Sequence, residues 1–165
     1  MENVLVAYAT RRGSTREVAA EVARIIRQSG VGVEISPARE VKSLDRYGAV
    51  VLGGALYMGR LHKDARKLLK RFRAELSSLP VAVFAMGPKS SEPEALEGAN
   101  AELARALAGA PDLHPFSTAV FGGVIDPSKL GFPFRRMPAV DARDWKAIEK
   151  WANEVVRGLS TVAGP

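Results

Sequence analysis

Residues 9–15 gather the residue types that bind a phosphate group. The segment follows an apolar stretch and carries three hydroxyls, on Thr10, Ser14 and Thr15, with Gly13 among them. A helical pattern begins directly after it, so unpaired N–H groups and the helix dipole would favour an anion at the same place. Gly13 lets the backbone close around the group because it has no Cβ. The segment therefore predicts a phosphate-binding loop at a helix N-terminus.

The motifs of other phosphate-binding folds do not occur in this segment. It contains neither the Gly-x-Gly-x-x-Gly of dinucleotide folds nor the Gly-x-x-x-x-Gly-Lys-Ser/Thr of nucleotide triphosphatases. A phosphorylated receiver domain would need an Asp after the third apolar run, where Gly53 and Gly54 stand. One alternative stays open: Ser14 and Glu17 have the spacing of a capping box, which would serve the helix alone. That box would still leave other donors for a phosphate.

The composition offers few residues for other kinds of catalysis. The chain has no cysteine, which excludes disulfides, thiol nucleophiles, iron–sulfur clusters and thiolate zinc sites. Two histidines, His62 and His114, leave little for a metal site or a serine triad, and we predict neither catalytic residues nor metal ligands. His62 lies near a predicted helix start, where we expect a structural or solvent-facing role; the alternative is that it protonates a bound molecule. Any redox chemistry must therefore belong to a bound cofactor.

Apolar runs alternate with amphipathic stretches along the chain, which predicts a parallel sheet with helices on both faces. We expect one doubly wound α/β domain over residues 1–165. In such sheets ligands bind beyond the carboxyl ends of the strands, where the loop 9–15 would lie. The predicted strands are residues 4–8, 31–35, 47–53, 79–86 and 116–124, the predicted helices are residues 14–28, 63–76, 92–107 and 141–159, and residues 126–142 are irregular.

Four stretches of the sequence resemble one protein family. Thr10-x-x-Gly13-x-Thr15 after the first strand resembles the phosphate loop of the flavodoxins. The closer resemblance is to the branch of the menaquinone-dependent protoporphyrinogen IX dehydrogenases, although the stretch 126–142 is shorter than the insert of that branch. The resemblance implies a flavodoxin-like three-layer sandwich with a five-stranded parallel sheet in the order 2-1-3-4-5. The stretches that carry it are residues 8–15, residues 53–59 with Leu61-His62, residues 120–123, and Asp144-Trp145.

The same resemblance implies FMN as the cofactor and assigns its contacts. The phosphate contacts are expected at Thr10, Arg11, Arg12, Gly13, Ser14 and Thr15. One side of the isoalloxazine ring is expected against Ala55, Leu56, Tyr57, Met58 and Gly59, and the other against Gly87, Pro88, Lys89 and Ser90. Gly122 and Gly123 are expected to approach the flavin where missing side chains leave room.

The predicted flavin site has an aromatic residue in only one of its two ring loops. The first loop offers Tyr57, whereas residues 87–93 contain no aromatic residue. We expect one flavin face to be covered by an aliphatic or backbone wall, or to be open to a flat partner such as a quinone. Tyr57 as a surface or packing residue is the alternative. Lys89 near the flavin would favour its reduced, anionic form; the alternative is an exposed lysine screened by salt.

Positive charge is concentrated in one segment. The chain has 24 Lys and Arg against 18 Asp and Glu, a net charge of +6, and residues 60–73 hold seven basic residues with Asp64 as the only acid. A helix face formed by this segment would suit an acidic redox partner, an anionic surface or substrate carboxylates. The alternative is that the segment forms a solvated helix exterior. Nucleic acid is not expected because no recognition motif is present. We expect neither a transmembrane segment nor a signal peptide, and therefore a cytoplasmic protein.

The sequence thus predicts an FMN-binding, flavodoxin-like redox protein. Two versions stay open: an oxidoreductase acting on a quinone- or porphyrinogen-type molecule, and an electron carrier that serves a partner protein. The alternative from another class is a non-catalytic α/β interaction module that has kept the fold and lost the cofactor. The hydroxyl-rich loop favours the redox protein.

Overall fold

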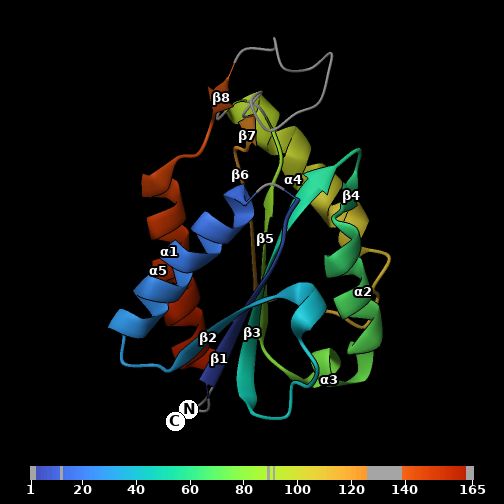
Figure 1. Ribbon diagram of the computed structural model, residues 1–165, viewed down its shortest axis with the longest axis vertical. Helices are drawn as coiled ribbons and strands as arrows, with labels where there is room; N and C mark the ends of the chain where they lie inside the picture. The colour runs from blue at the N-terminus through green and yellow to red at the C-terminus, as the bar shows by residue number, and fades with distance from the viewer. Residues whose placement is uncertain (1–2, 12, 89, 91, 126–138, 163–165) are drawn as a thin grey trace.

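A parallel β-sheet forms the centre of the structure. The computed structural model describes residues 3–11, 13–88, 90, 92–125 and 139–162. Five strands pair in parallel in the order β2-β1-β3-β5-β6, which confirms the predicted topology (Figure 1). Their bounds are β1 Asn3–Ala9, β2 Val33–Pro37, β3 Tyr47–Tyr57, β5 Val81–Met86 and β6 Ser117–Phe121.

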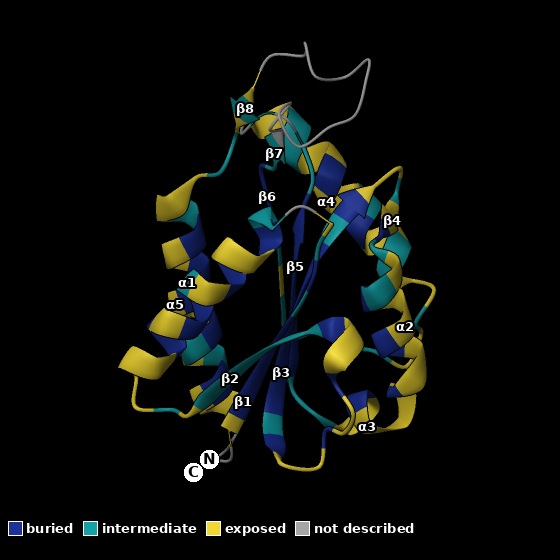
Figure 2. Cartoon of the chain, viewed as in Figure 1, coloured by how far each residue is buried: buried dark blue, intermediate teal, exposed yellow. Residues whose placement is uncertain are grey.

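Helices cover both faces of this sheet and complete three layers (Figure 1). One apolar cluster joins the sheet to α1 (Ser14–Gln28) and α5 (Trp145–Val162). A second cluster joins the opposite face to α2 (Lys63–Arg71), α3 (Arg73–Ser78) and α4 (Pro93–Leu107). Figure 2 shows the buried residues along the strands and the exposed ones on the outer sides of the helices.

Strand β1 shows why the sequence pattern identifies this sheet. Leu5 and Ala7 pack in the cluster with α2, whereas Val4 and Val6 pack in the cluster with α1, and all four are fully buried. Successive side chains of a strand point to opposite faces, so a strand between two helical layers is apolar at every position. The unbroken apolar run therefore predicts the central strand correctly.

The segment predicted as one helix over residues 63–76 forms two. Phe72 lies between the two helices, as the C-cap of α2 and the N-cap of α3, with φ of −105° and ψ of 27°. The break leaves both Phe72 and Leu76 buried in the same core cluster. Periodicity detects the apolar side of this segment, and packing decides where the helix axis turns.

Strand β3 continues past the predicted end at Gly53. It turns back as β4 (Arg60–Leu61), so the sheet has six strands among the described residues. A separate antiparallel pair joins β7 (Val124–Ile125) to β8 (Val140–Asp141). The residues between these two short strands, 126–138, lie outside the described part of the chain.

The connection between β2 and β3 differs from the other crossovers of the sheet. It contains the 3₁₀ turn η1 (Ala38–Glu40), whereas the connections from β1 to β2, from β3 to β5 and from β5 to β6 contain α-helices. Ala38 packs in the core cluster of α2. The sheet beside α2 is therefore covered here by a short turn.

Candidate functional site

The carboxyl ends of neighbouring strands bring the predicted site residues to one edge of the sheet. Strands β1, β3, β5 and β6 are consecutive in the sheet and run in the same direction (Figure 1). Loops that follow such strands meet at one edge although they are distant in sequence. The predicted phosphate loop, both predicted ring loops and the glycines after β6 therefore share this edge. Arg12 and Lys89 lie outside the described residues.

The loop after β1 contains a turn closed by its own side chain. The hydroxyl of Thr10 accepts a hydrogen bond from the N–H of Gly13, with 3.1 Å between the N and Oγ1 atoms. Gly13 has φ of +91° and is the N-cap of α1. A residue with a Cβ is strained in this region, so glycine fits the entry into the helix. Arg11, in the same loop, is exposed.

Thr15 carries the most informative atom of this loop. The residue is fully buried, and its Oγ1 has no hydrogen-bond partner among the described residues. A buried hydroxyl without a partner costs about 1–3 kcal/mol, which makes such groups rare in native proteins. The start of a helix also presents unpaired N–H groups. An orphaned hydroxyl beside these donors fits the phosphate of the predicted cofactor.

The capping box that the sequence leaves open does not form. Gly13 is the cap residue, Ser14 is the first residue of the helix, and no side chain caps it. The carboxylate of Glu17 forms an ion pair with Arg143 instead of turning back to the cap. The hydroxyl-rich loop is therefore not explained by helix capping.

Sequence reasoning does not predict a role for Arg143. Its guanidinium donates hydrogen bonds to both carboxylate oxygens of Asp141, at 3.0 and 2.8 Å, and lies over the ring of Trp145. The hydrogen bonds that Arg143 donates, first to Asp141 and then to Glu17, outweigh burial and raise the pKa of Arg143. This cation offsets the charge of Glu17, which would otherwise repel an anion at the start of α1. Glu17 and Arg143 are 126 positions apart, so their spacing in the sequence does not predict this ion pair.

The hairpin of β3 and β4 presents two exposed apolar side chains at the same edge. Tyr57 pairs with Arg60, and the turn residues Met58 and Gly59 have φ of +50° and +76°. Two successive positive φ angles are typical of a type I′ turn. Tyr57 is 75% and Met58 85% exposed. The left-handed conformation of Met58 costs about 1–2 kcal/mol, and such strain is often found at functional sites.

The base of the hairpin is joined to α2 through His62. The N–H of His62 donates to the carbonyl of Ala55 at 2.8 Å, and Leu56 beside it is buried. Nδ1 of His62 accepts a hydrogen bond from the N–H of Asp64 and caps α2. Burial is the largest effect on the pKa of His62 and lowers it. The Asp64 carboxylate raises this pKa, and the positive charge of Arg11 lowers it further. His62 therefore has a structural role at the start of α2.

The loops after β5 and β6 are tied together through their backbones. The N–H of Gly123 donates to the carbonyl of Pro88 at 2.8 Å, and a Cβ on Gly123 would lie 3.4 Å from the oxygen of Gly87. A Cβ on Gly122 would clash with the carbonyl oxygen of Ala142. The space expected beside Gly122 is filled by the chain itself. Packing therefore explains this glycine, and its contact with a cofactor stays a prediction.

The loop after β5 ends in a turn that leads into α4. Oγ of Ser90 accepts a hydrogen bond from the N–H of Glu92 at 3.0 Å, one residue before the helix begins. Gly87, Pro88 and Ser90 are half-buried at the edge. This loop offers backbone and aliphatic atoms rather than an aromatic ring.

The family of the chain is decided by its match to a protein-family model. The model of the flavodoxin domain matches residues 5–140. The chain belongs to the flavodoxin domain family. Membership confirms the resemblance seen in the sequence and FMN as the expected cofactor, while the residues that hold the cofactor remain a prediction.

One curated relative of this chain is the protoporphyrinogen IX dehydrogenase (quinone) of Escherichia coli (strain K12). It is 25% identical over 92 residues, which cover 54% of this chain and 51% of that protein. The chain thus spans about half the length of the curated relatives it matches. The similarity supports the branch indicated by the sequence.

Solved structures share the fold of this chain. Oxidised Flavodoxin 2 from Bacillus cereus has a TM-score of 0.62 at 18% identity, covering 93% of this chain and 95% of that chain. Rubredoxin oxygen:oxidoreductase from Desulfovibrio gigas has a TM-score of 0.65 at 14% identity, covering 100% of this chain and 38% of that chain. At these identities the similarity establishes the fold.

The described residues of the chain contain neither a membrane-spanning helix nor a candidate metal cluster. None of their helices is both long and apolar enough to cross a membrane. No group of three or more His, Asp or Glu side chains lies where it could hold a metal ion within the same ranges.

Proposed function

We propose that this chain is an FMN-dependent redox protein that exchanges electrons with a quinone- or porphyrinogen-type molecule or with a partner protein. The observation that carries the proposal is the buried hydroxyl of Thr15, which has no partner among the described residues at the start of α1. The phosphate of FMN supplies oxygens that accept hydrogen bonds from such a group. When bound, the flavin would accept and donate the electrons.

The chain's own residues would bind and orient the cofactor. The hydroxyls of Ser14 and Thr15 and the first N–H groups of α1 would hold the phosphate, and Gly13 would let the backbone approach it. The hydrogen bond from the N–H of Gly13 to the hydroxyl of Thr10 would help to hold this loop in shape. Arg11 and Arg12 are proposed to contact the phosphate as well.

The ring would lie between two unequal loops. The hairpin offers Tyr57 on one side, whereas the loop with Gly87, Pro88, Lys89 and Ser90 has no aromatic residue on the other. An uncovered flavin face favours a flat partner that stacks directly on the ring. The name of the Escherichia coli relative, a quinone-linked protoporphyrinogen IX dehydrogenase, agrees with a planar partner of this kind. We expect the protein to act in the cytoplasm.

An electron carrier is the second candidate, favoured by the basic segment. Residues 60–73 begin within the hairpin and continue along α2, so a partner protein bound there would lie beside the proposed flavin site. Turnover of a porphyrinogen with a quinone would support the oxidoreductase. Reduction only by a ferredoxin or flavodoxin reductase would support the carrier.

An absorption spectrum of the purified protein tests the cofactor, before and after adding FMN and removing the excess. We expect bands near roughly 370 and 450 nm that stay with the protein, as for a bound flavin. A folded protein that retains no flavin absorbance would overturn the proposal in favour of a cofactor-free interaction module. Circular dichroism of the same sample shows whether the protein is folded.

A further inference from the structure

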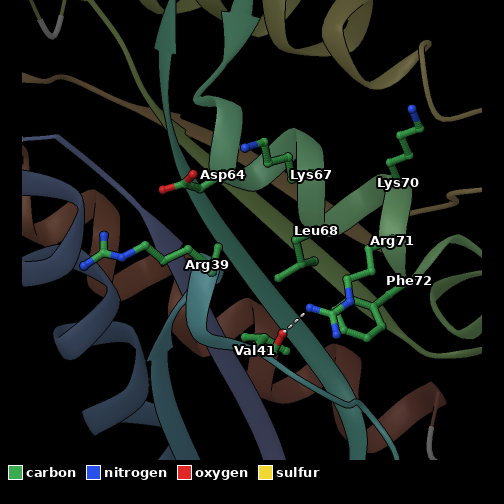
Figure 3. Close-up of a pocket in the computed structure, with 9 residues that line it drawn as sticks. Arg39, Val41, Asp64, Lys67, Leu68, Lys70, Arg71 and Phe72 are labelled. Carbon is green, nitrogen blue, oxygen red and sulfur yellow. Dashed lines mark hydrogen bonds between the residues drawn. The ribbon is translucent and has the colours of Figure 1, made fainter.

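A groove lies on the flank of α2, the helix that follows the hairpin of β3 and β4 (Figure 3). It has a volume of about 630 Å³ and lies between η1 with Val41 on one side and α2 on the other. Apolar side chains of Val41, Leu68 and Phe72 form its floor, and all three are buried. The charged residues that line it are four cations and one carboxylate: Arg39, Lys67, Lys70, Arg71 and Asp64.

The groove is a consequence of the short connection between β2 and β3. A helix in that connection would lie against the sheet beside α2, and the turn η1 leaves this space open. Arg71 fixes one end of the groove, since its guanidinium donates to the carbonyl of Val41 at 3.3 Å (Figure 3). It also donates to the carbonyl of Lys42 at 3.4 Å. The same guanidinium lies 5.0 Å from the ring centroid of Phe72. These contacts make the groove a preformed surface.

The cations of α2 lack acidic partners within the described residues. The helix carries five Lys and Arg at exposed positions, and none of them forms a salt bridge there. Many of them are three or four positions apart, a spacing at which like charges destabilise a helix. The carboxylate of Asp64 lies 3.8 Å from His62. An external anion would therefore relieve the repulsion along this helix.

We propose that the groove docks an acidic segment of a partner protein. Carboxylates of that segment would face Arg39 and Lys67, and an apolar side chain between them would contact the floor. The inference rests on the proposed function, because α2 begins directly after the hairpin that carries Tyr57 and a partner here would lie beside the flavin. A flat bilayer surface fits less well, since the apolar part of this face is recessed between charged side chains.

A labelled peptide tests the proposal on the full chain. The probe is a short fluorescein-labelled peptide of glutamates interrupted by leucines, and its binding is followed by fluorescence anisotropy at low salt. The variant with Arg39→Glu and Lys67→Glu changes both walls of the groove. The control variant with Lys146→Glu and Lys150→Glu makes the same change in net charge on exposed residues of α5, across the sheet from α2. We expect the dissociation constant to rise about tenfold or more in the first variant and to change little in the second.

Three results would overturn docking in the groove. Equal weakening in the two variants would mean that the peptide binds to net charge alone. A peptide with serine in place of leucine that bound as tightly would show that the apolar floor contributes nothing. Sedimentation with phosphatidylglycerol vesicles, in the absence of peptide binding, would assign this face to a membrane instead.

The same titration separates this proposal from the cofactor. Peptide binding is measured on the protein with and without added FMN, and flavin absorbance is recorded in each sample. Retained FMN without peptide binding would overturn docking in the groove and leave the proposed function intact. Peptide binding in a protein that never retains FMN would overturn the proposed function and leave an acidic-segment binding module.

Discussion

Substitution of Thr15 by valine separates a cofactor role of its hydroxyl from a structural one. The side chain is fully buried, and its Oγ1 has no partner among the described residues. Valine keeps the branched shape and replaces the hydroxyl with a methyl group. If the hydroxyl is there for a phosphate, Thr15→Val should weaken cofactor binding and stabilise the cofactor-free protein. A purely structural role gives the opposite result for stability.

The two effects have comparable size. A hydrogen bond to a charged group contributes about 1.5–3 kcal/mol, so its loss should raise the dissociation constant of FMN roughly 10- to 150-fold. Without FMN, the unpaired hydroxyl costs about 1–3 kcal/mol, and its removal should raise the free energy of unfolding by about 1 kcal/mol because repacking is imperfect. A substitution that merely disrupted the fold would lower both the FMN affinity and the free energy of unfolding. A lower affinity with a higher free energy of unfolding therefore points to a cofactor role.

Both quantities are accessible with purified protein. Quenching of FMN fluorescence gives the dissociation constant, and urea unfolding followed by circular dichroism gives the free energy for the cofactor-free form. Thr118→Val is the matched control, since Thr118 is exposed on β6. An unchanged FMN affinity together with a destabilised protein would refute the reasoning, because the hydroxyl would then serve the fold.

Three further predictions follow from the described contacts. Gly122→Ala should lower the free energy of unfolding by about 1–3 kcal/mol, since its Cβ would clash with the backbone carbonyl oxygen of Ala142. The control Gly98→Ala, in a helix with open space beside it, should raise the free energy of unfolding by roughly 0.5–1 kcal/mol, and thermal melts compare the two. Arg143→Gln should weaken FMN binding in fluorescence titrations by leaving the charge of Glu17 unbalanced, and adding Glu17→Gln should restore most of it; no recovery would rule out this electrostatic role. The pKa of His62 is lowered from 6.5, so its contribution to stability is complete above pH 6.5 and declines as the pH falls through the lowered value. His62→Asn keeps a capping side chain and should flatten that decline in urea titrations across this range, whereas an unchanged slope would assign it to other groups.

Local patterns were sufficient for the layers of the fold and for the strand and helix on either side of the proposed phosphate loop. The apolar run at residues 4–8 predicts a strand buried on both faces, because a strand alternates its side chains between faces. The pattern over residues 14–28 predicts α1 with the same first and last residues that the helix has in the structure. Both signals lie within a few residues of one another, where backbone geometry alone determines which side chains share a face.

The boundaries of other elements depended on packing. Periodicity predicts one helix over residues 63–76, and the burial of Phe72 and Leu76 accompanies its division into α2 and α3. The hairpin at Met58 could not be predicted from the sequence either, since a positive φ is unusual for a residue with a side chain. The division of the helix depends on contacts with distant parts of the core, which no single window of sequence contains.

The sequence by itself determined the chemistry available to this protein: a hydroxyl-rich loop at a helix start, no cysteine, and a basic segment over residues 60–73. Only the tertiary structure showed that Thr15 is buried without a partner among the described residues, that Glu17 pairs with Arg143, and that the segment borders a groove. Residue types and short spacings are properties of the chain. Burial, pairing over 126 positions and the shape of a surface arise only when distant segments pack together.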